Sequence, residues 1–168
     1  MCFIFFIGGN EIQKECTEHV RRNGKLSEGE IFCSKPGTLS CKMIVHACGP
    51  TWKGGANQES DHLTECVQSA LEATDKFGFR SIAFPALCTG IFGYPIKQAT
   101  TVIVKAVRSY MKDKKVSSIK EIILCDMKAE TVKSFTEALQ QAYKGKVKVF
   151  NKNIPQGPRP EMVKGKYI

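Results

Sequence analysis

Residues 81–110 read SIAFPALCTGIFGYPIKQATTVIVKAVRSY and carry three local signals in a fixed order. First comes an apolar run over 81–87, whose length suits a buried strand. Next comes a loop in which Gly90 and Gly93 permit positive φ angles. Pro95 then suits the first helical position, because its missing N–H costs nothing there. A strand that leads through such a loop into a helix presents unpaired N–H groups and a positive dipole end, which favours binding of an anion such as phosphate.

The loop alone leaves a second interpretation open, because a tight strand-to-helix turn that binds nothing has the same spacing. Neither G-x-x-x-x-G-K-[ST] nor G-x-G-x-x-G occurs in the chain, which argues against a P-loop nucleotidase and a dinucleotide-dependent dehydrogenase. Phe92 either leans on a ribose or plugs the base of the loop. Cys88 is either a buried structural cysteine or a thiol whose pKa is lowered at the helix start.

Length and composition indicate one domain with its own core. A chain of 168 residues buries about two-thirds of its unfolded surface. The eight cysteines include no C-x-x-C pair, so we interpret them as reduced thiols of a nuclear or cytoplasmic protein. The net charge of +9 favours an anionic partner, although the lysines are scattered without the aromatic residues of a nucleic-acid groove. Residues 1–7 are apolar but too short to cross a bilayer, and they lack the basic start of a signal peptide.

Strand and helix patterns alternate along the chain. Apolar faces at helical spacing predict helices over residues 10–23, 60–77, 95–111 and 130–143. Short apolar runs predict strands over 30–34, 42–48, 81–87, 121–126 and, as a last edge strand, 146–150. Strands separated by helices of this length form βαβ units. We therefore expect an α/β fold with a mostly parallel sheet and helices on both faces.

Ligands of parallel sheets lie beyond the carboxyl ends of the strands. The loops over 49–55, 88–93 and 125–127 are therefore expected on one rim. Within the last loop, Asp126 either caps the following helix or contacts a ligand.

Other polar residues are candidates for catalysis or metal binding. Glu59 and Asp61 lie near the first rim loop and are candidates for a general base. Two pairs on helices have spacings that can hold a metal ion: Cys16 with His19, and His62 with Cys66. Matches of two residues are common by chance, so we expect no metal site.

Taken together, these segments resemble a macrodomain, in particular those found in large vertebrate ADP-ribosyltransferases of the antiviral-response group. The resemblance covers residues 8–145 and rests on the joint spacing of Gly49-Pro50 after Ile44-Val45-His46-Ala47, Phe84-Pro85-Ala86, Thr89-Gly90-Ile91-Phe92-Gly93-Tyr94-Pro95, and Cys125-Asp126. It implies a three-layer α/β/α fold that holds ADP-ribose, free or attached to a protein. The ligand-binding residues expected on this basis are Thr89, Gly90, Ile91, Phe92, Gly93, Tyr94, Cys125, Asp126 and Met127. The resemblance implies that backbone groups of residues 89–93 surround the diphosphate and the distal ribose. It also implies that residues 125–127 flank the adenine or its ribose.

The chain departs from the family's pattern at its start. Family members begin with two further strands, an Asp that meets the adenine amine, an Asn-Ala-Ala-Asn-like segment and a glycine-rich first phosphate loop, and none of these is found in the sequence. Gly8 and Gly9 match instead the turn after the family's first helix. We therefore expect an N-terminally truncated domain, with an atypical start over 1–7 such as a truncated isoform would have, an incomplete macrodomain over 8–150, and a Pro/Gly/Lys-rich linker or tail over 151–168. The shortened sheet should expose an edge that favours association with another chain.

The resemblance implies a reader of free ADP-ribose or mono-ADP-ribosylated proteins, with affinity weakened by the truncation and with no catalytic residue, metal or cofactor. The parent protein would be a multidomain ADP-ribosyltransferase connected with NAD metabolism and innate immunity, in the nucleus, the cytoplasm or both. Two alternatives stay open. One is an ADP-ribosyl-protein hydrolase, which would have to work without the first loop. The other is binding of poly(ADP-ribose) or nucleic acid through the basic surface, with a steep salt dependence.

Overall fold

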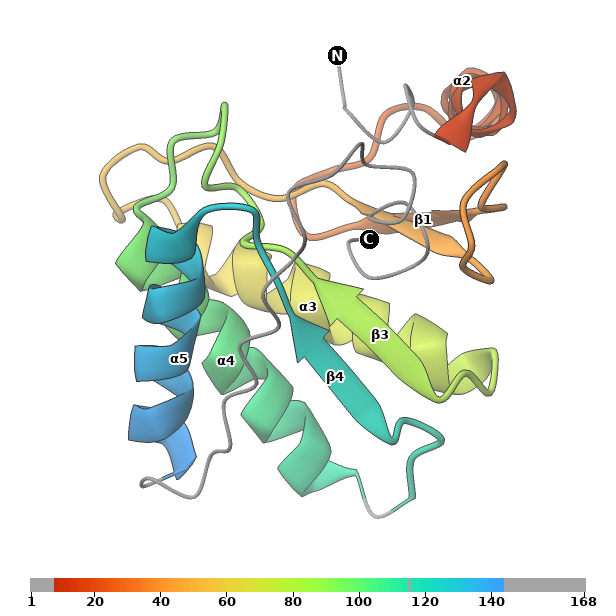
Figure 1. The fold of residues 1–168 in the computed structure, drawn as a ribbon. Helices are drawn as coiled ribbons and strands as arrows, with labels where there is room; N and C mark the ends of the chain where they lie inside the picture. The colour runs from red at the N-terminus through yellow and green to blue at the C-terminus, as the bar shows by residue number, and fades with distance from the viewer. Residues whose placement is uncertain (1–7, 115, 144–168) are drawn as a thin grey trace.

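The computed structural model describes residues 8–114 and 116–143 (Figure 1). In chain order the elements are α2 (Asn10–Asn23), β1 (Ile31–Ser34), β2 (Ile44–Ala47), α3 (Glu59–Lys76), β3 (Ser81–Phe84), α4 (Ile96–Asp113), β4 (Glu121–Leu124) and α5 (Ala129–Tyr143). These are the expected helices and strands, with ends that differ by a few residues. The expected edge strand over 146–150, the start over 1–7 and the tail over 151–168 lie outside the described residues. No helix in the described part is long and apolar enough to span a membrane.

The strands in the described part of the chain form two separate pairs. β3 and β4 are parallel, with Ser81 opposite Glu121 and Phe84 opposite Leu124, and α4 connects them as a βαβ unit. β1 and β2 are antiparallel, so the expectation of parallel pairing is wrong for this pair. The physical reason is the connection over residues 35–43, which contains turns and no helix. So short a connection returns the chain beside the strand it has left, whereas a parallel pair needs a crossover.

The main core of the described residues lies between the β3–β4 pair and the helices α3, α4 and α5. In Figure 1, α3 passes behind β3, and α4 runs beside α5. The buried side chains come from β3 and the three helices and include Leu63, Val67, Leu71, Phe84, Ile103, Val107 and Phe135, and Ile122 and Leu124 of β4 pack against them while only partly buried. A smaller cluster, formed by Ile12, Leu39 and Ile44, joins α2 to the β1–β2 hairpin. Burying a side chain of this size contributes about 1.5–3 kcal/mol, so these contacts hold the strand ends in place.

Asp75, at the C-terminal end of α3, fixes the end of the β3–β4 pair that lies away from the expected rim. Its carboxylate accepts hydrogen bonds from the hydroxyl of Tyr110 (2.6 Å), the hydroxyl of Ser117 (2.8 Å), and the N–H (2.8 Å) and hydroxyl (3.0 Å) of Ser118. Burial alone would raise the pKa of Asp75, but these donors outweigh it and lower the pKa to about 2. The carboxylate thus joins α3, α4 and the segment that leads into β4.

Candidate functional site

Two of the three expected loops meet beyond the C-terminal end of β3. The backbone N–H of Trp52 donates to the carbonyl oxygen of Phe92 over 2.8 Å. The ring of Trp52 lies 4.6 Å from the ring of Tyr94, centroid to centroid. Gly49 packs so closely on Cys88 that a Cβ at that position would collide with the sulfur. The loop after β2 and the loop after β3 therefore form one packed unit.

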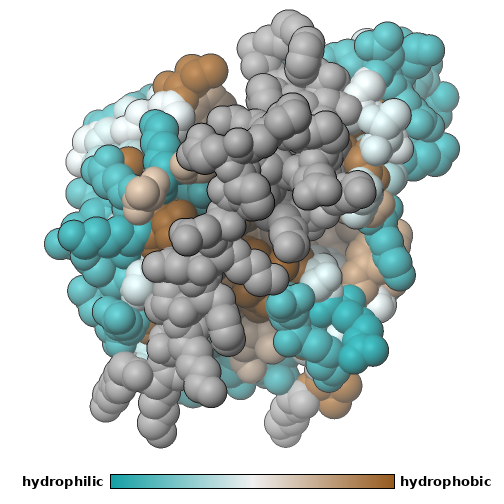
Figure 2. All heavy atoms as spheres, in the orientation of Figure 1, coloured by the Kyte–Doolittle hydropathy of each residue, from teal (hydrophilic) through white to brown (hydrophobic). Residues whose placement is uncertain are grey.

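Three consecutive backbone amides of this unit have no hydrogen-bond acceptor within the described part of the chain. Among the described residues, no hydrogen bond is made by the N–H groups of Gly90, Ile91 and Phe92. The segment is open to solvent, since Ile91 is 95% exposed and Phe92 is 41% exposed. Figure 2 shows an apolar spot at the tip of this loop, set in a largely hydrophilic surface. Successive exposed N–H groups of this kind can bind the oxygen atoms of an anion.

The groups next to these amides bond or pack within the loop itself. The N–H of Gly93 donates to the oxygen of Gly90 (3.0 Å), so Gly93 has no free donor for a ligand. Both the N–H (3.4 Å) and the hydroxyl (2.8 Å) of Thr89 donate to the oxygen of Ala86. The ring of Tyr94 is 3% exposed and supports the loop from within. These residues shape the site, and the free donors belong to residues 90–92.

Two residues with positive φ enclose the loop. Gly93 has a φ of 68° and Cys88 has a φ of 65°. Such a φ costs a residue with a Cβ about 1 kcal/mol or more, so its presence at Cys88 means that the surroundings impose it. The imposing contacts are the close packing of Gly49 on the thiol and the hydrogen bond from the N–H of Tyr94 to the oxygen of Cys88 (3.0 Å).

The N-terminal end of α4 lies directly after this loop. Pro95 is its N-cap, so the helix begins one residue later than the sequence predicts, at Ile96. The end has no side-chain cap and no acidic residue in its first turn, whereas the first turns of α2, α3 and α5 each contain a glutamate. The first turn of α4 itself thus contains no carboxylate to balance the positive end of the helix dipole, which favours an anion there.

The third loop, over residues 125–127, follows β4 at the same edge. The N–H of Cys125 donates to the oxygen of Phe84 over 3.0 Å and extends the pairing of β3 with β4. Asp126 accepts the N–H of Lys128 over 2.9 Å just before α5 begins, so its side chain supports the turn that leads into the helix. Met127 is 65% exposed beside it. This loop offers an exposed apolar side chain beside the carboxylate of Asp126.

Glu59, which the sequence suggested only as a candidate base, has a different role. It is 1% exposed, and its carboxylate accepts the N–H groups of Lys53 (2.9 Å), Gly55 (3.0 Å) and Asn57 (2.6 Å). Burial would raise the pKa of Glu59, but hydrogen bonds from its own N–H and from these three outweigh it and lower the pKa to about 2. A carboxylate held in this way is a poor proton acceptor. The sequence feature that indicates this role is an acidic residue at the start of a helix that follows a glycine-containing loop.

In the described part of the chain, Cys88 and the two candidate metal pairs do not form reactive sites. Burial and the neighbouring Cys66 and Cys48 raise the pKa of Cys88 to about 12, which favours the alternative of a structural cysteine over that of a thiol with a lowered pKa. Over the described ranges, no group of three or more side chains is arranged to hold a metal ion. Of the two candidate pairs, Cys16 instead contacts His46, and His62 contacts Glu65.

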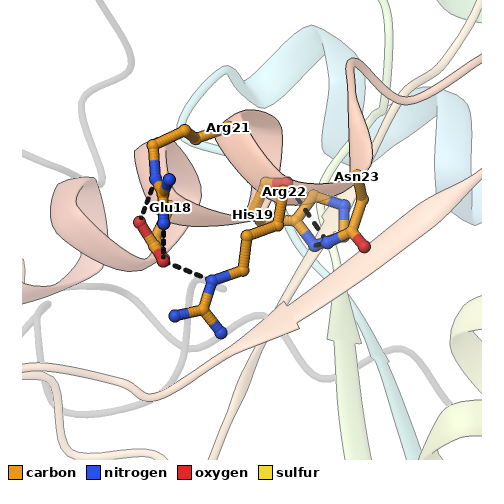
Figure 3. Close-up of polar contacts among 5 residues, drawn as sticks. All are labelled: Glu18, His19, Arg21, Arg22 and Asn23. Carbon is orange, nitrogen blue, oxygen red and sulfur yellow. Dashed lines mark hydrogen bonds and ion pairs between the residues drawn. The ribbon is translucent and has the colours of Figure 1, made fainter.

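An open concavity of about 640 Å³ lies elsewhere, between the end of α2, the chain over 24–31 and α3. Figure 3 shows the polar contacts on the neighbouring turn of α2, where Glu18 accepts hydrogen bonds from Arg21 and Arg22, and Asn23 lies against His19. The concavity itself is lined by residues of both charge signs, including Lys25, Glu28, Glu30 and Glu65. This mixture does not indicate one class of ligand.

Comparison with known proteins identifies the family. The family model described as Macro domain matches residues 3–103, which is more than half of the chain. The chain belongs to the macro domain family. Human protein mono-ADP-ribosyltransferase PARP14 is 36% identical over 138 residues, which is 81% of this chain and 8% of that protein. A macro domain-containing protein of Listeria monocytogenes is 35% identical over 131 residues, covering 78% of this chain and 74% of that one.

An O-acetyl-ADP-ribose deacetylase of Salmonella gallinarum is also similar, at 37% identity over 103 residues, covering 61% of this chain and 58% of that enzyme. Among solved structures, the Oceanobacillus iheyensis macrodomain with ADP has a TM-score of 0.75 and 26% identity, covering 84% of this chain and 74% of that one. A point mutant of the same macrodomain with ADPR has the same TM-score and identity, covering 84% and 76%. The α/β macrodomain fold expected from the sequence is therefore confirmed.

Proposed function

We propose that this macro domain binds ADP-ribose, free or attached to a protein, at the rim formed by the loops after β2, β3 and β4. The observation that carries the proposal is the run of unpartnered amides at Gly90, Ile91 and Phe92, next to the uncapped end of α4. The similar macrodomain of Oceanobacillus iheyensis has been solved with ADP and with ADPR, which supports a ligand containing a diphosphate.

The free amides suit a diphosphate because they are donors and carry no side-chain charge that must be desolvated. A hydrogen bond from an N–H to a charged oxygen contributes about 1.5–3 kcal/mol. The α4 dipole adds about 0.3–1 kcal/mol for an anion at its end. Binding of this kind needs no metal, no covalent step and no arginine clamp. The affinity then depends on how well the three amides are oriented before the ligand arrives.

The ends of ADP-ribose are assigned to the apolar parts of the rim. Phe92, 41% exposed beside the bonded Trp52, offers a ring on which a ribose can rest. Met127, 65% exposed after β4, offers an apolar surface for the adenine or its ribose. The hydrogen bond from the N–H of Lys128 to Asp126 spans Met127 and holds the backbone on either side of it. The role given to residues 125–127 is the one that the sequence predicts.

Hydrolysis of an ADP-ribosyl bond is the second candidate, favoured by the similarity to the O-acetyl-ADP-ribose deacetylase. Two rim side chains that could serve as a base or nucleophile are poorly suited to it. Glu59 has a pKa of about 2, and Cys88 has a pKa of about 12. These observations support a reader over a hydrolase. Incubation with a mono-ADP-ribosylated protein distinguishes the two, because a reader leaves the label in place and a hydrolase releases it.

Titration calorimetry with ADP-ribose tests the proposal, with Gly90→Glu as the diagnostic variant. Gly90 has no neighbouring atom within 4 Å of a Cβ placed on it and no positive φ, so the chain itself tolerates the substitution. The added carboxylate would stand among the free amides and repel the diphosphate, and we expect affinity to fall at least about tenfold. Gln140→Glu, an exposed position near the far end of α5, adds the same charge as a control. Absence of binding by the folded wild type, or wild-type binding by Gly90→Glu, would overturn the proposal.

A further inference from the structure

Within the part of the chain described here, Glu59 is the only residue of α3 whose carboxylate accepts hydrogen bonds from the backbone of residues 53–57. The loop has little regular structure of its own, and it includes two residues with positive φ, Gly54 (104°) and Gly55 (89°). A backbone segment of this kind is ordered by whatever accepts its N–H groups. Here one buried carboxylate accepts three of them, so the path of the loop depends on a single side chain.

Trp52, which immediately precedes this segment, carries that order to the amide run. Its indole packs on Gly55, where an added Cβ would lie 2.9 Å from the ring, and on Tyr94 at 4.6 Å. Its N–H donates to the oxygen of Phe92. The turn that Glu59 organises is therefore joined to the loop after β3 both by a ring contact and by a backbone hydrogen bond.

The hydrogen bond to Phe92 matters because it acts on a peptide next to the free donors. Without it, the hydrogen bonds that hold the tip of the loop are the bond from Gly93 to Gly90 and the bond from Tyr94 to Cys88. Each free peptide plane could then rotate more widely, and an anion would have to order it on binding. Amides oriented in advance bind more tightly, because the ordering cost has been met on folding.

We propose that Glu59 is a positioning residue for the anion-binding amides of Gly90, Ile91 and Phe92, acting through the 53–57 loop and Trp52. The proposal rests on the ADP-ribose function proposed above and assigns Glu59 no contact with the ligand. This role differs from a general role in stability, because it predicts that a change at Glu59 alters the amides of residues 90–92. A carboxylate elsewhere that accepts as many hydrogen bonds should not have this effect.

Asp75 supplies that comparison within the same chain. Like Glu59 it is a carboxylate on α3 that accepts several hydrogen bonds and has a pKa lowered to about 2. It lies at the opposite end of α3 and bonds to Tyr110, Ser117 and Ser118, none of which belongs to the rim. Glu59→Gln and Asp75→Asn therefore make the same chemical change, one next to the amide run and one away from it.

The test compares ¹⁵N-labelled wild type with these two variants, without ligand and then with ADP-ribose. We expect Glu59→Gln to shift the amide resonances of residues 90–92 and to weaken ADP-ribose binding roughly fivefold. Asp75→Asn should lower the melting temperature but leave both readouts near those of the wild type. Glu59→Asp, which keeps the charge on a shorter side chain, should show smaller changes in the same direction. It replaces Glu59→Gln as the test variant if Glu59→Gln does not fold.

Unchanged resonances at residues 90–92 in Glu59→Gln would overturn the inference, as would an equal loss of affinity in Asp75→Asn. Failure of the wild type to bind ADP-ribose would instead overturn the proposed function. In that case the ligand-free resonances still decide whether Glu59 positions the amides.

Discussion

The backbone N–H of Trp52 donates to the oxygen of Phe92 over 2.8 Å, and this bond crosses between two parts of the fold that the described strands leave separate. Trp52 follows β2 of the antiparallel pair, and Phe92 follows β3 of the parallel pair. The packing of Gly49 on Cys88 reinforces the same junction. The rim is thus assembled by loop contacts, and substitutions that alter the loop backbone should affect ligand binding more than substitutions in the strands.

Gly93 and Gly90 form a matched pair for testing the backbone of the loop. Neither would bring a Cβ within 4 Å of another atom, but Gly93 has a φ of 68° and Gly90 has no positive φ. We expect Gly93→Ala to lower the free energy of unfolding by about 1–2 kcal/mol, because its Cβ meets the following carbonyl in the left-handed region. Gly90→Ala should change it by less than about 0.5 kcal/mol. Urea denaturation measures both, and equal effects would contradict the conformation described for this loop.

Stability should fall in acid through Glu59 and Asp75. Each has a folded pKa of about 2, lowered from ordinary values of 4.5 and 3.8. A lowered folded pKa stabilises the protein above the unfolded pKa, and this contribution is lost as the pH falls toward the folded pKa. The free energy of unfolding should therefore decrease between about pH 5 and pH 2. Denaturation of Asp75→Asn should show a shallower decrease, and Glu137→Gln, at an exposed position in the middle of α5, should follow the wild type.

Local signals made much of the fold predictable. The apolar run, two glycines and one proline over 81–95 indicate a strand, a loop and a helix start, and β3 and α4 lie there. The short connection over 35–43 favours the antiparallel pairing of β1 and β2, whereas the alternation of strands with helices along the rest of the chain favours parallel pairing. What local patterns could not show was which amides stay free. Gly93 donates to Gly90 because of the path of the loop, and no spacing of residue types specifies that path.

The role of Glu59 was beyond sequence reasoning for a related reason. Its three donors come from irregular backbone over 53–57, which has no periodicity to place it relative to a helix. Its charge and its place near the rim suggested a base, whereas its burial and its hydrogen bonds decide against one. The same reasoning applies to Cys88, where closeness to a helix start suggested a lowered pKa and burial produces a raised one.

Cys88 should consequently react slowly with iodoacetamide in the folded protein. Its pKa of about 12 lies well above the ordinary value of 9.0, and only the thiolate reacts. At pH 8 the thiolate fraction should be roughly a thousandfold lower than in the unfolded chain. Mass spectrometry of peptides from native and urea-unfolded samples gives the rate at this site. Rapid modification of Cys88 in the native protein would mean that the packing on Gly49 is not maintained in solution.

The dependence of binding on salt distinguishes recognition by the rim from recognition by the net charge of +9. ADP-ribose bound by neutral amides has only the two charges of its diphosphate, so the slope of log K against log salt should stay below about 2 in magnitude. A poly(ADP-ribose) chain or a nucleic acid bound through many lysines would give a slope that rises with each phosphate neutralised. We expect calorimetry between low and moderate salt to show the shallow slope, and Gln140→Glu to leave it unchanged. A steep slope for ADP-ribose itself would mean that basic side chains, and not the amides of residues 90–92, supply most of the affinity.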